Sequence, residues 1–447
     1  MVRLAEDDEP AWAARVNGFS EHSDSKANGL TTTKIGGLDA PTHPDHNWWW
    51  QRTAPLLATL LRSAGSYTYE QQIDHMRAYR DAVVPTYGPP TPQTTIRPLL
   101  TMDGSPFEPS WNFQNDGSVV RYSFEPLLPN DDPENPFPGD KITTLLPLLR
   151  YVAPGADTRW FEQVWSRWFV HEKNEVAAAK AALPPHKPRA PQIFVAFDMK
   201  GAERIMKVYL FPVLKHLATG ISSEELTWST IRDLKPGGEG FTKVVDKLST
   251  FLAGYKEHIP VEMIAIDCID PAKARIKVYA RTKSNSINTI RDVCTLGGLQ
   301  MDESTMRGVE NLSKIWHLLL DEPTGIAADQ SKPPRFPKDH HVGICFVFEM
   351  RPGQDRIEVK CHLPWVQTNS NDIRTTANFT EALELLGYER HASKYARGAL
   401  AAAMIPGMDF SKPGALSYTS YNYGRGHLGY GDYISSYFSP MCQGYDQ

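Results

Sequence analysis

The sequence of 447 residues lacks the features that mark membrane, secreted and nucleic-acid-binding proteins. No apolar run is long enough to cross a bilayer, and residues 1–10 have no apolar core of the kind found in signal peptides. The formal net charge is −5, so no overall basic field would attract nucleic acid or anionic lipid. We therefore expect a cytoplasmic protein that binds neither nucleic acid nor membranes.

Recognisable metal and nucleotide motifs are missing as well. The five cysteines are odd in number and without CxxC spacing, which favours free thiols in a reducing compartment over disulfides or zinc. Asp131, Asp132 and Glu134 surround a proline and lack DDxxD spacing, and the glycine-rich residues 235–240 lack the pattern of a P-loop. We expect no bound metal.

A repeated pattern of charge and aromaticity is present instead. Three segments alternate with a period of two residues, as β-strands do, and each places a basic residue two positions before a ring. The pairs are Lys207 and Tyr209, Lys277 and Tyr279, and Lys360 and His362. Side chains two positions apart share one face of a strand, so aligned strands would form a positive floor beside an aromatic wall. This pattern predicts a site for an anion joined to a cationic or apolar group.

The expected elements follow the order helix, helix, strand, strand, which occurs four times with part of a fifth. Hairpins are predicted within residues 106–124, 192–211, 260–282 and 342–363, and a last strand within 417–423. The Gly- and Tyr-rich residues after it, with Tyr430, Tyr433 and Tyr437, are interpreted as a lid or a tail. Without βαβ alternation a doubly wound parallel sheet is unfavoured, and the pattern predicts an α+β fold with a closed antiparallel barrel inside a layer of helices. We expect one domain over residues 46–438, a poorly ordered segment 1–45 and a tail 439–447.

Six motifs in order identify a family. FEPSWNFQ, VVRYSFEP, MKVYLFP, ARIKVYART, EVKCHLP and SYTSYNY, with the helical WWWQRTAPLLATLL, resemble the fungal aromatic prenyltransferases of the dimethylallyltryptophan synthase family over roughly residues 46–438. The resemblance implies the prenyltransferase (ABBA) barrel, with ten antiparallel strands from ααββ units and the site in its lumen. It also implies a metal-independent transferase of secondary metabolism that moves a prenyl group, most often dimethylallyl, from its diphosphate to an indole in alkaloid biosynthesis.

The chemistry of that family needs three kinds of side chain. The leaving diphosphate needs fixed cations, the allylic cation needs π faces and exclusion of water, and the indole N–H needs a hydrogen-bond acceptor. By resemblance the diphosphate ligands are Arg121, Lys207, Arg275, Lys277 and Lys360. The shielding rings are Tyr209, Tyr279, Tyr418, Tyr423 and His362, with Tyr421 as a further candidate. Glu108 corresponds to the catalytic acceptor of the indole hydrogen bond.

Two departures from the family bear on the substrate. His362 stands where the family usually has tyrosine, which alters the shield or a phosphate contact and affects which prenyl diphosphate fits. Members that prenylate C4 of free tryptophan use a lysine base at the position of Phe194, so a tryptophan-containing cyclic dipeptide or a related indole is the favoured acceptor. Two alternatives remain: prenylation of a phenolic or tricyclic polyketide acceptor, and a carrier that binds an amphipathic anion without catalysis. We expect a monomer or a homodimer.

Overall fold

The structure is a computed structural model that describes residues 34–90, 96–115, 117–128, 137, 142–184, 189–426 and 429–442. Most of the predicted N-terminal segment 1–45 lies outside these residues. The acidic residues Asp131, Asp132 and Glu134 and the last five residues of the predicted tail lie outside them too.

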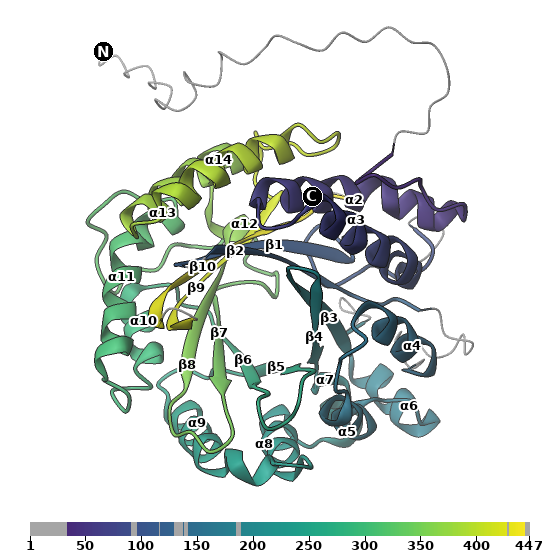
Figure 1. The fold of residues 1–447 in the computed structure, drawn as a ribbon. Coiled ribbons are helices and arrows are strands. Elements are labelled where there is room, and N and C mark those ends of the chain that lie inside the picture. The colour runs from purple at the N-terminus through teal and green to yellow at the C-terminus, as the bar shows by residue number, and fades with distance from the viewer. Residues whose placement is uncertain are drawn as a thin grey trace, which may run out of the picture. The chain divides into compact units, whose positions relative to one another are not determined.

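The described residues contain ten β-strands, which form one closed antiparallel barrel (Figure 1). Around the barrel each strand pairs with its neighbours in the chain, and β1 pairs with β10 to close it. The strands are β1 (Phe107–Gln114), β2 (Gly117–Phe124), β3 (Ile193–Lys200), β4 (Glu203–Leu210), β5 (Val261–Asp267), β6 (Ile276–Thr282), β7 (Ile344–Met350), β8 (Glu358–Pro364), β9 (Leu416–Gly426) and β10 (Gly429–Phe438). The predicted fold class is confirmed.

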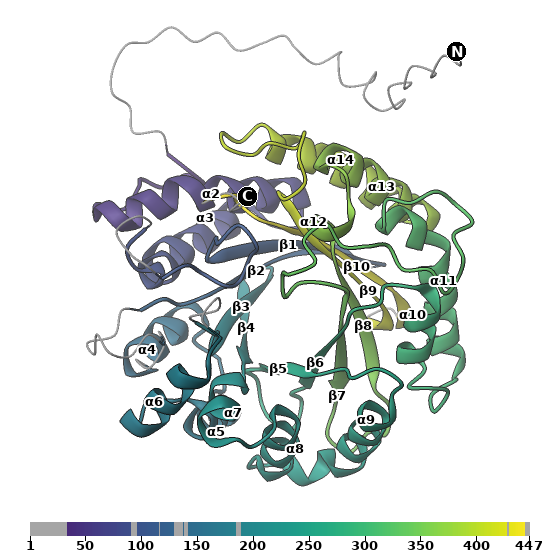
Figure 2. The same cartoon turned by 180° about the vertical axis from the view of Figure 1, so that it is seen from behind.

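Helices precede each pair of strands and lie outside the barrel, as Figures 1 and 2 show from opposite sides. They are α2 (Pro44–Ala64), α3 (Tyr69–Ala78), α4 (Ile142–Val152), α5 (Arg159–Trp168), α6 (Lys173–Ala182), α7 (Val213–Thr219), α8 (Ser223–Asp233), α9 (Thr242–Gly254), α10 (Ile287–Cys294), α11 (Glu303–Leu319), α12 (Trp365–Thr368), α13 (Asp372–Leu385) and α14 (Glu389–Ala403). In the part of the chain that is described, no helix is long and apolar enough to cross a membrane.

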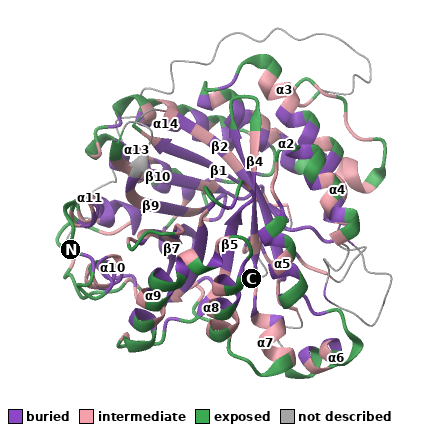
Figure 3. Ribbon diagram, turned by 60° about the horizontal axis from the view of Figure 1, so that its bottom comes forward, coloured by how far each residue is buried: buried purple, intermediate pink, exposed green. Residues whose placement is uncertain are grey.

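The main core fills the space between these helices and the outer face of the barrel. On β6 the side chains of Ile276, Val278 and Ala280 are fully buried in it, as the alternation predicts. Figure 3 shows buried residues along the strands and exposed residues on the outward sides of the helices. The inner face of the barrel is thereby left for polar and aromatic side chains.

The end of the chain differs from the prediction. Residues 424–426 complete β9 and residues 429–438 form β10, whose Ser435 and Tyr437 pair with Asn112 and Ser110 of β1. Glycines such as Gly424 and Gly431 interrupt the alternation of side chains that would identify a strand. The pairing partner, β1, comes from the other end of the barrel sequence, so the interpretation as a lid or a tail was wrong.

Candidate active site

A large cavity occupies the lumen of the barrel. Its volume is about 1470 Å³, above the 300–1000 Å³ that is usual for a site holding one small molecule. The cavity is lined by alternate residues of the strands, because the other set faces the helices. The predicted residues that line it are Glu108, Arg121, Lys207, Arg275, Lys277, Lys360, Tyr209, Tyr279, Tyr418 and His362.

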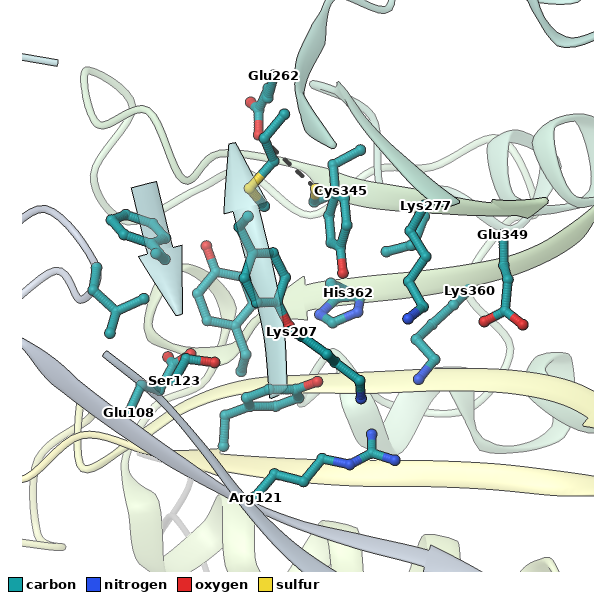
Figure 4. Close-up of a pocket in the computed structure, with 18 of the residues that line it drawn as sticks. Glu108, Arg121, Ser123, Lys207, Glu262, Lys277, Cys345, Glu349, Lys360 and His362 are labelled. Carbon is teal, nitrogen blue, oxygen red and sulfur yellow. Dashed lines mark hydrogen bonds between the residues drawn. The ribbon is translucent and has the colours of Figure 1, made fainter. Parts of the chain in front are cut away.

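Basic side chains converge on one region of this cavity. In Figure 4 the ammonium groups of Lys207, Lys277 and Lys360 and the guanidinium group of Arg121 point toward one another. They come from four different strands, β4, β6, β8 and β2. Arg275, which directly precedes β6, lines the same cavity. We call these five side chains the cation floor.

Carboxylates hold the cation floor in place. Asp198 lies 2.5 Å from Lys207 Nζ and 2.9 Å from Arg121 Nε. Asp267 lies 2.7 Å from Lys277 Nζ and 2.6 Å from Arg275 Nε.

Glu349 adds a bond of 2.9 Å to Nη1 of Arg275. Three carboxylates therefore hold four of the five basic side chains in place, and they are too few to neutralise the whole cation floor. This bracing preorganises the positive charge before a ligand enters, which is the condition for efficient electrostatic stabilisation.

Lys360 is the exception. Among the described residues no carboxylate lies within ion-pair distance of its ammonium group, which instead lies 4.2 Å from the centre of the Tyr433 ring. Burial, followed by the charge of Arg121, holds the pKa of Lys360 well below its ordinary value. The same two causes lower the pKa of Lys207 to about 7. An anion bound here would restore the charge of both lysines.

Aromatic rings form the next tier of the cavity, two residues along the strands and so roughly 7 Å from the cation floor. Tyr209 and Tyr279 lie 5.8 Å apart between ring centres. His362 lies 6.2 Å from Tyr279 and 5.5 Å from Tyr437. This tier offers π faces and buried hydroxyl groups beside the bound anion.

Two tyrosines of β10 belong to the lining but were not predicted as site residues. Tyr433 and Tyr437 both face the cavity, and the Tyr433 hydroxyl donates to Asn112 Oδ1 over 2.9 Å. Their spacing of four residues, with Ser435 between them, is the signal of a shared strand face. The sequence contained this signal, but the tail interpretation concealed it.

Tyr423 and Tyr421 do not line the cavity. On β9 the even-numbered Tyr418 and Asn422 face the lumen, so odd-numbered residues point outward. Tyr423 packs against Gly308 of α11, where a Cβ atom would lie 2.6 Å from Tyr423 Cβ. Tyr421 donates a hydrogen bond to Asp432. Neither residue can shield a cation in the lumen.

Glu108 lies on β1, away from the three lysines (Figure 4). The Ser417 hydroxyl donates to its Oε1 atom over 2.8 Å, and 9% of the residue is exposed. Burial raises the pKa of Glu108 to about 8, an effect that the bond from Ser417 partly offsets. Phe194 of β3 also lines the cavity and packs edge-on against Phe211 at 4.8 Å, so this wall is apolar.

A second polar group lies further along the strands from the cation floor. Arg281 Nε is 2.7 Å from Glu262 Oε1, and Cys345 Sγ is 3.9 Å from Glu262 Oε2. Arg281 follows Lys277 by four residues of β6, or about 13 Å. The cavity thus has separate polar ends with an aromatic middle.

Among the described residues, one group of side chains could hold a metal ion. Asp339, His340 and His341 place their ligand atoms within 4.8 Å of one another, in the loop before β7. His341 Nδ1 is 2.9 Å from Asp339 Oδ1. Two imidazoles and one carboxylate suit a transition metal better than Mg²⁺, which prefers oxygen ligands. His340 and His341 also line the cavity, and His341 lies 6.0 Å from Tyr418 between ring centres, with its Nδ1 atom held by Asp339.

Known proteins resemble this chain in sequence and in fold. Residues 45–398 match the profile of the family described as tryptophan dimethylallyltransferase. An indole diterpene prenyltransferase from Tolypocladium album is 36% identical over 78% of this chain and 84% of its own. An O-glucose prenyltransferase from Phomopsis amygdali is 32% identical over 79% of this chain and 82% of its own. The crystal structure of AnaPT from Neosartorya fischeri has the same fold, with a TM-score of 0.77 and 24% identity, over 92% of this chain and 97% of that one.

Proposed function

Since the chain belongs to the tryptophan dimethylallyltransferase family of aromatic prenyltransferases, we propose that it joins a dimethylallyl group to the indole ring of an acceptor larger than free tryptophan. The observation that carries this proposal is the order of the lumen: a cation floor, then aromatic rings, with the buried carboxylate of Glu108 away from the lysines. That order matches the diphosphate, the prenyl group and the indole of one reacting complex.

The first step is ionisation of dimethylallyl diphosphate. Negative charge on the leaving oxygen grows as its bond to carbon breaks, and the cation floor stabilises that charge. Because Asp198 and Asp267 already fix the basic side chains, little reorganisation is needed at the moment of reaction. Tyr209, Tyr279 and Tyr437 present π faces to the allylic cation and exclude water, which would otherwise capture it.

The second step is attack by the indole ring on the allylic cation. The carboxylate of Glu108 accepts the indole N–H, so the ring gains electron density as positive charge develops on it. Ser417 keeps the Glu108 side chain oriented. A hydrogen bond to a charged acceptor is roughly twice as strong as one to a neutral acceptor, and this bond stabilises the transition state more than the ground state.

Two observations favour a large acceptor. The cavity of about 1470 Å³ exceeds the needs of a diphosphate and a free amino acid together. Phe194 gives an apolar wall where an enzyme acting on C4 of tryptophan would need a basic group. A tryptophan-containing cyclic dipeptide and an indole bearing a terpenoid ring system both meet these conditions, and the second resembles the acceptor class named for the Tolypocladium relative.

The proposed co-substrate is dimethylallyl diphosphate, and no metal is proposed in its binding. The cations of the floor neutralise the diphosphate directly, and the cluster at Asp339 lies in a loop outside the barrel strands. We propose a cytoplasmic location, which the five free cysteines support because thiols persist in a reducing compartment.

The test is an acceptor panel incubated with dimethylallyl diphosphate and analysed by mass spectrometry and diphosphate release. The panel contains free tryptophan, tryptophan-containing cyclic dipeptides, terpenoid indoles, a tricyclic polyketide and a glucoside. The proposal predicts prenylation of a large indole in preference to tryptophan. Transfer confined to the polyketide or to a sugar hydroxyl would refute the indole assignment, and binding without diphosphate release would indicate a carrier.

A further inference from the structure

The reaction proposed above needs a group that takes a proton from the ring. When the indole attacks through a ring carbon that carries hydrogen, the prenylated carbon still holds that hydrogen, and the ring regains aromaticity only when the proton leaves. The lysine that does this in some relatives is replaced here by Phe194, which cannot accept a proton. Another side chain of the cavity must therefore serve.

Most carboxylates in and beside the lining already hold another side chain. Asp198, Asp267 and Glu349 form ion pairs with the cation floor. Glu262 holds Arg281, and Glu108 faces the indole N–H. Asp432 accepts hydrogen bonds from Asn311 and Tyr421. Glu358 lies beyond Lys360 on β8, on the side of the cation floor away from the aromatic tier.

His362 is placed differently from all of these groups. It lies in the aromatic tier, between Tyr279 at 6.2 Å and Tyr437 at 5.5 Å, where the allylic carbon and the ring must meet. Figure 4 shows its imidazole in the middle of the cavity, beside the lysines. Among the described residues none makes a hydrogen bond to either ring nitrogen.

The charge state of His362 suits a proton acceptor. Burial, and then the positive charges of Lys360 and Arg281, hold the pKa of His362 well below its ordinary value, so the imidazole is neutral with a free lone pair. Diphosphate bound at the cation floor would bring negative charge close to the imidazole and make it more basic. The basicity of His362 thus increases only when the prenyl donor is in place.

We propose that His362 is the catalytic base that removes the ring proton after carbon–carbon bond formation. The electron pair of the C–H bond returns to the indole, and the proton goes to the free ring nitrogen of His362. The imidazolium that forms lies about two strand residues from Lys360 and the pyrophosphate. Its charge is stabilised by the pyrophosphate, an oxygen of which then takes the proton and leaves with it.

This role differs in its consequences from a role as a shielding ring. If His362 only shields, its loss lets water capture the allylic cation, whatever isotope the acceptor carries. If His362 is the base, its loss lets the arenium ion return to the allylic cation, and this return competes with a slow C–H cleavage. Deuterium at that carbon slows the cleavage further, so more of the arenium ion returns to the allylic cation. The ratio of prenyl alcohol to prenylated acceptor then rises.

The experiment compares His362→Gln and His362→Tyr with wild type, using the accepted indole with hydrogen or deuterium at the prenylated carbon. Tyr279→Leu serves as a shield variant and the exposed His258→Gln as a control. Loss of a general base typically costs 10²–10⁴-fold, so we expect prenylation to fall by about a hundredfold or more in both His362 variants. Deuterium at the prenylated carbon should raise the ratio of prenyl alcohol to prenylated acceptor in the two His362 variants. In wild type, Tyr279→Leu and His258→Gln the same ratio should not change with deuterium.

Two variants keep the test decisive if one of them fails to fold, which a thermal melt would show. An alcohol ratio insensitive to deuterium in the folded His362 variants, or their unchanged turnover, would overturn the proposal. So would prenylation at the indole nitrogen or at a substituted C3, because no carbon-bound proton is then lost. The proposal rests on the proposed function, which is prenylation of an indole. The product of the wild-type enzyme tests that function, and the isotope effect in the variants tests the role of His362 separately.

Discussion

Lys277 provides the sharpest test of the cation floor. Its ammonium group lies 2.7 Å from Asp267 Oδ1, and 11% of its side chain is exposed. Lys277→Ala would not leave Asp267 unpaired, because Arg275 Nε also contacts that carboxylate at 2.6 Å. The substitution therefore removes positive charge from the site without leaving a buried charge uncompensated, and its effect on folding should be modest.

The effect on catalysis should be large. Removing one preorganised contact to a developing oxyanion costs about 3 kcal/mol, which is on the order of a hundredfold in rate. We expect kcat/KM for dimethylallyl diphosphate to fall by that factor, and kcat to fall as well, because the charge on the leaving group grows in the transition state. The assay is diphosphate release alongside product formation. Lys173→Ala at the exposed start of α6 is the matched control, and equally small effects from both substitutions would show that the floor is only polar lining.

Three further predictions follow from the same site and its scaffold. Turnover should survive excess EDTA, because the basic side chains bind the diphosphate; complete loss of activity that magnesium restores would contradict this. Glu108 must be ionised to accept the indole N–H, and its pKa is about 8, so kcat/KM for the acceptor at saturating diphosphate should rise with pH and level off above about 8. Glu108→Gln should be slow and lack this rise, whereas the same rise in that variant would assign it to another group. Gly398→Ala on α14 would place its Cβ 2.5 Å from Trp111 Cζ3. Thermal unfolding should therefore show that the free energy of unfolding falls by about 1–3 kcal/mol, whereas an unchanged Tm would mean that the Trp111 ring moves aside without cost.

Where polar and apolar side chains alternate regularly along a strand, the sequence alone predicted which residues face the inside of the barrel. Lys207 with Tyr209 and Lys277 with Tyr279 share a face because two positions along a strand restore the same direction. The same rule, applied from Tyr418, excludes Tyr421 and Tyr423, whose motif match had suggested otherwise. Periodicity within a strand was therefore a better guide than the motif as a whole.

Contacts between distant strands could not be predicted in this way. Asp198 of β3 contacts Arg121 of β2, and Glu349 of β7 contacts Arg275, although a long stretch of chain separates the two partners in each pair. The bond from Ser417 to Glu108 joins β9 to β1, although 309 positions separate the two residues in the chain. The low pKa of His362 likewise depends on Arg281, which belongs to a different strand. Such effects arise from the assembly of different hairpins into one closed barrel, which local sequence does not encode.

The most direct test of the central claim is a comparison of the accepted indole with its N-methyl derivative. The claim is that the Glu108 carboxylate activates an indole N–H while the cation floor ionises dimethylallyl diphosphate. We predict that N-methylation strongly lowers kcat for prenylation, whereas release of diphosphate and prenyl alcohol continues. An N-methylindole prenylated as fast as its parent would contradict the account.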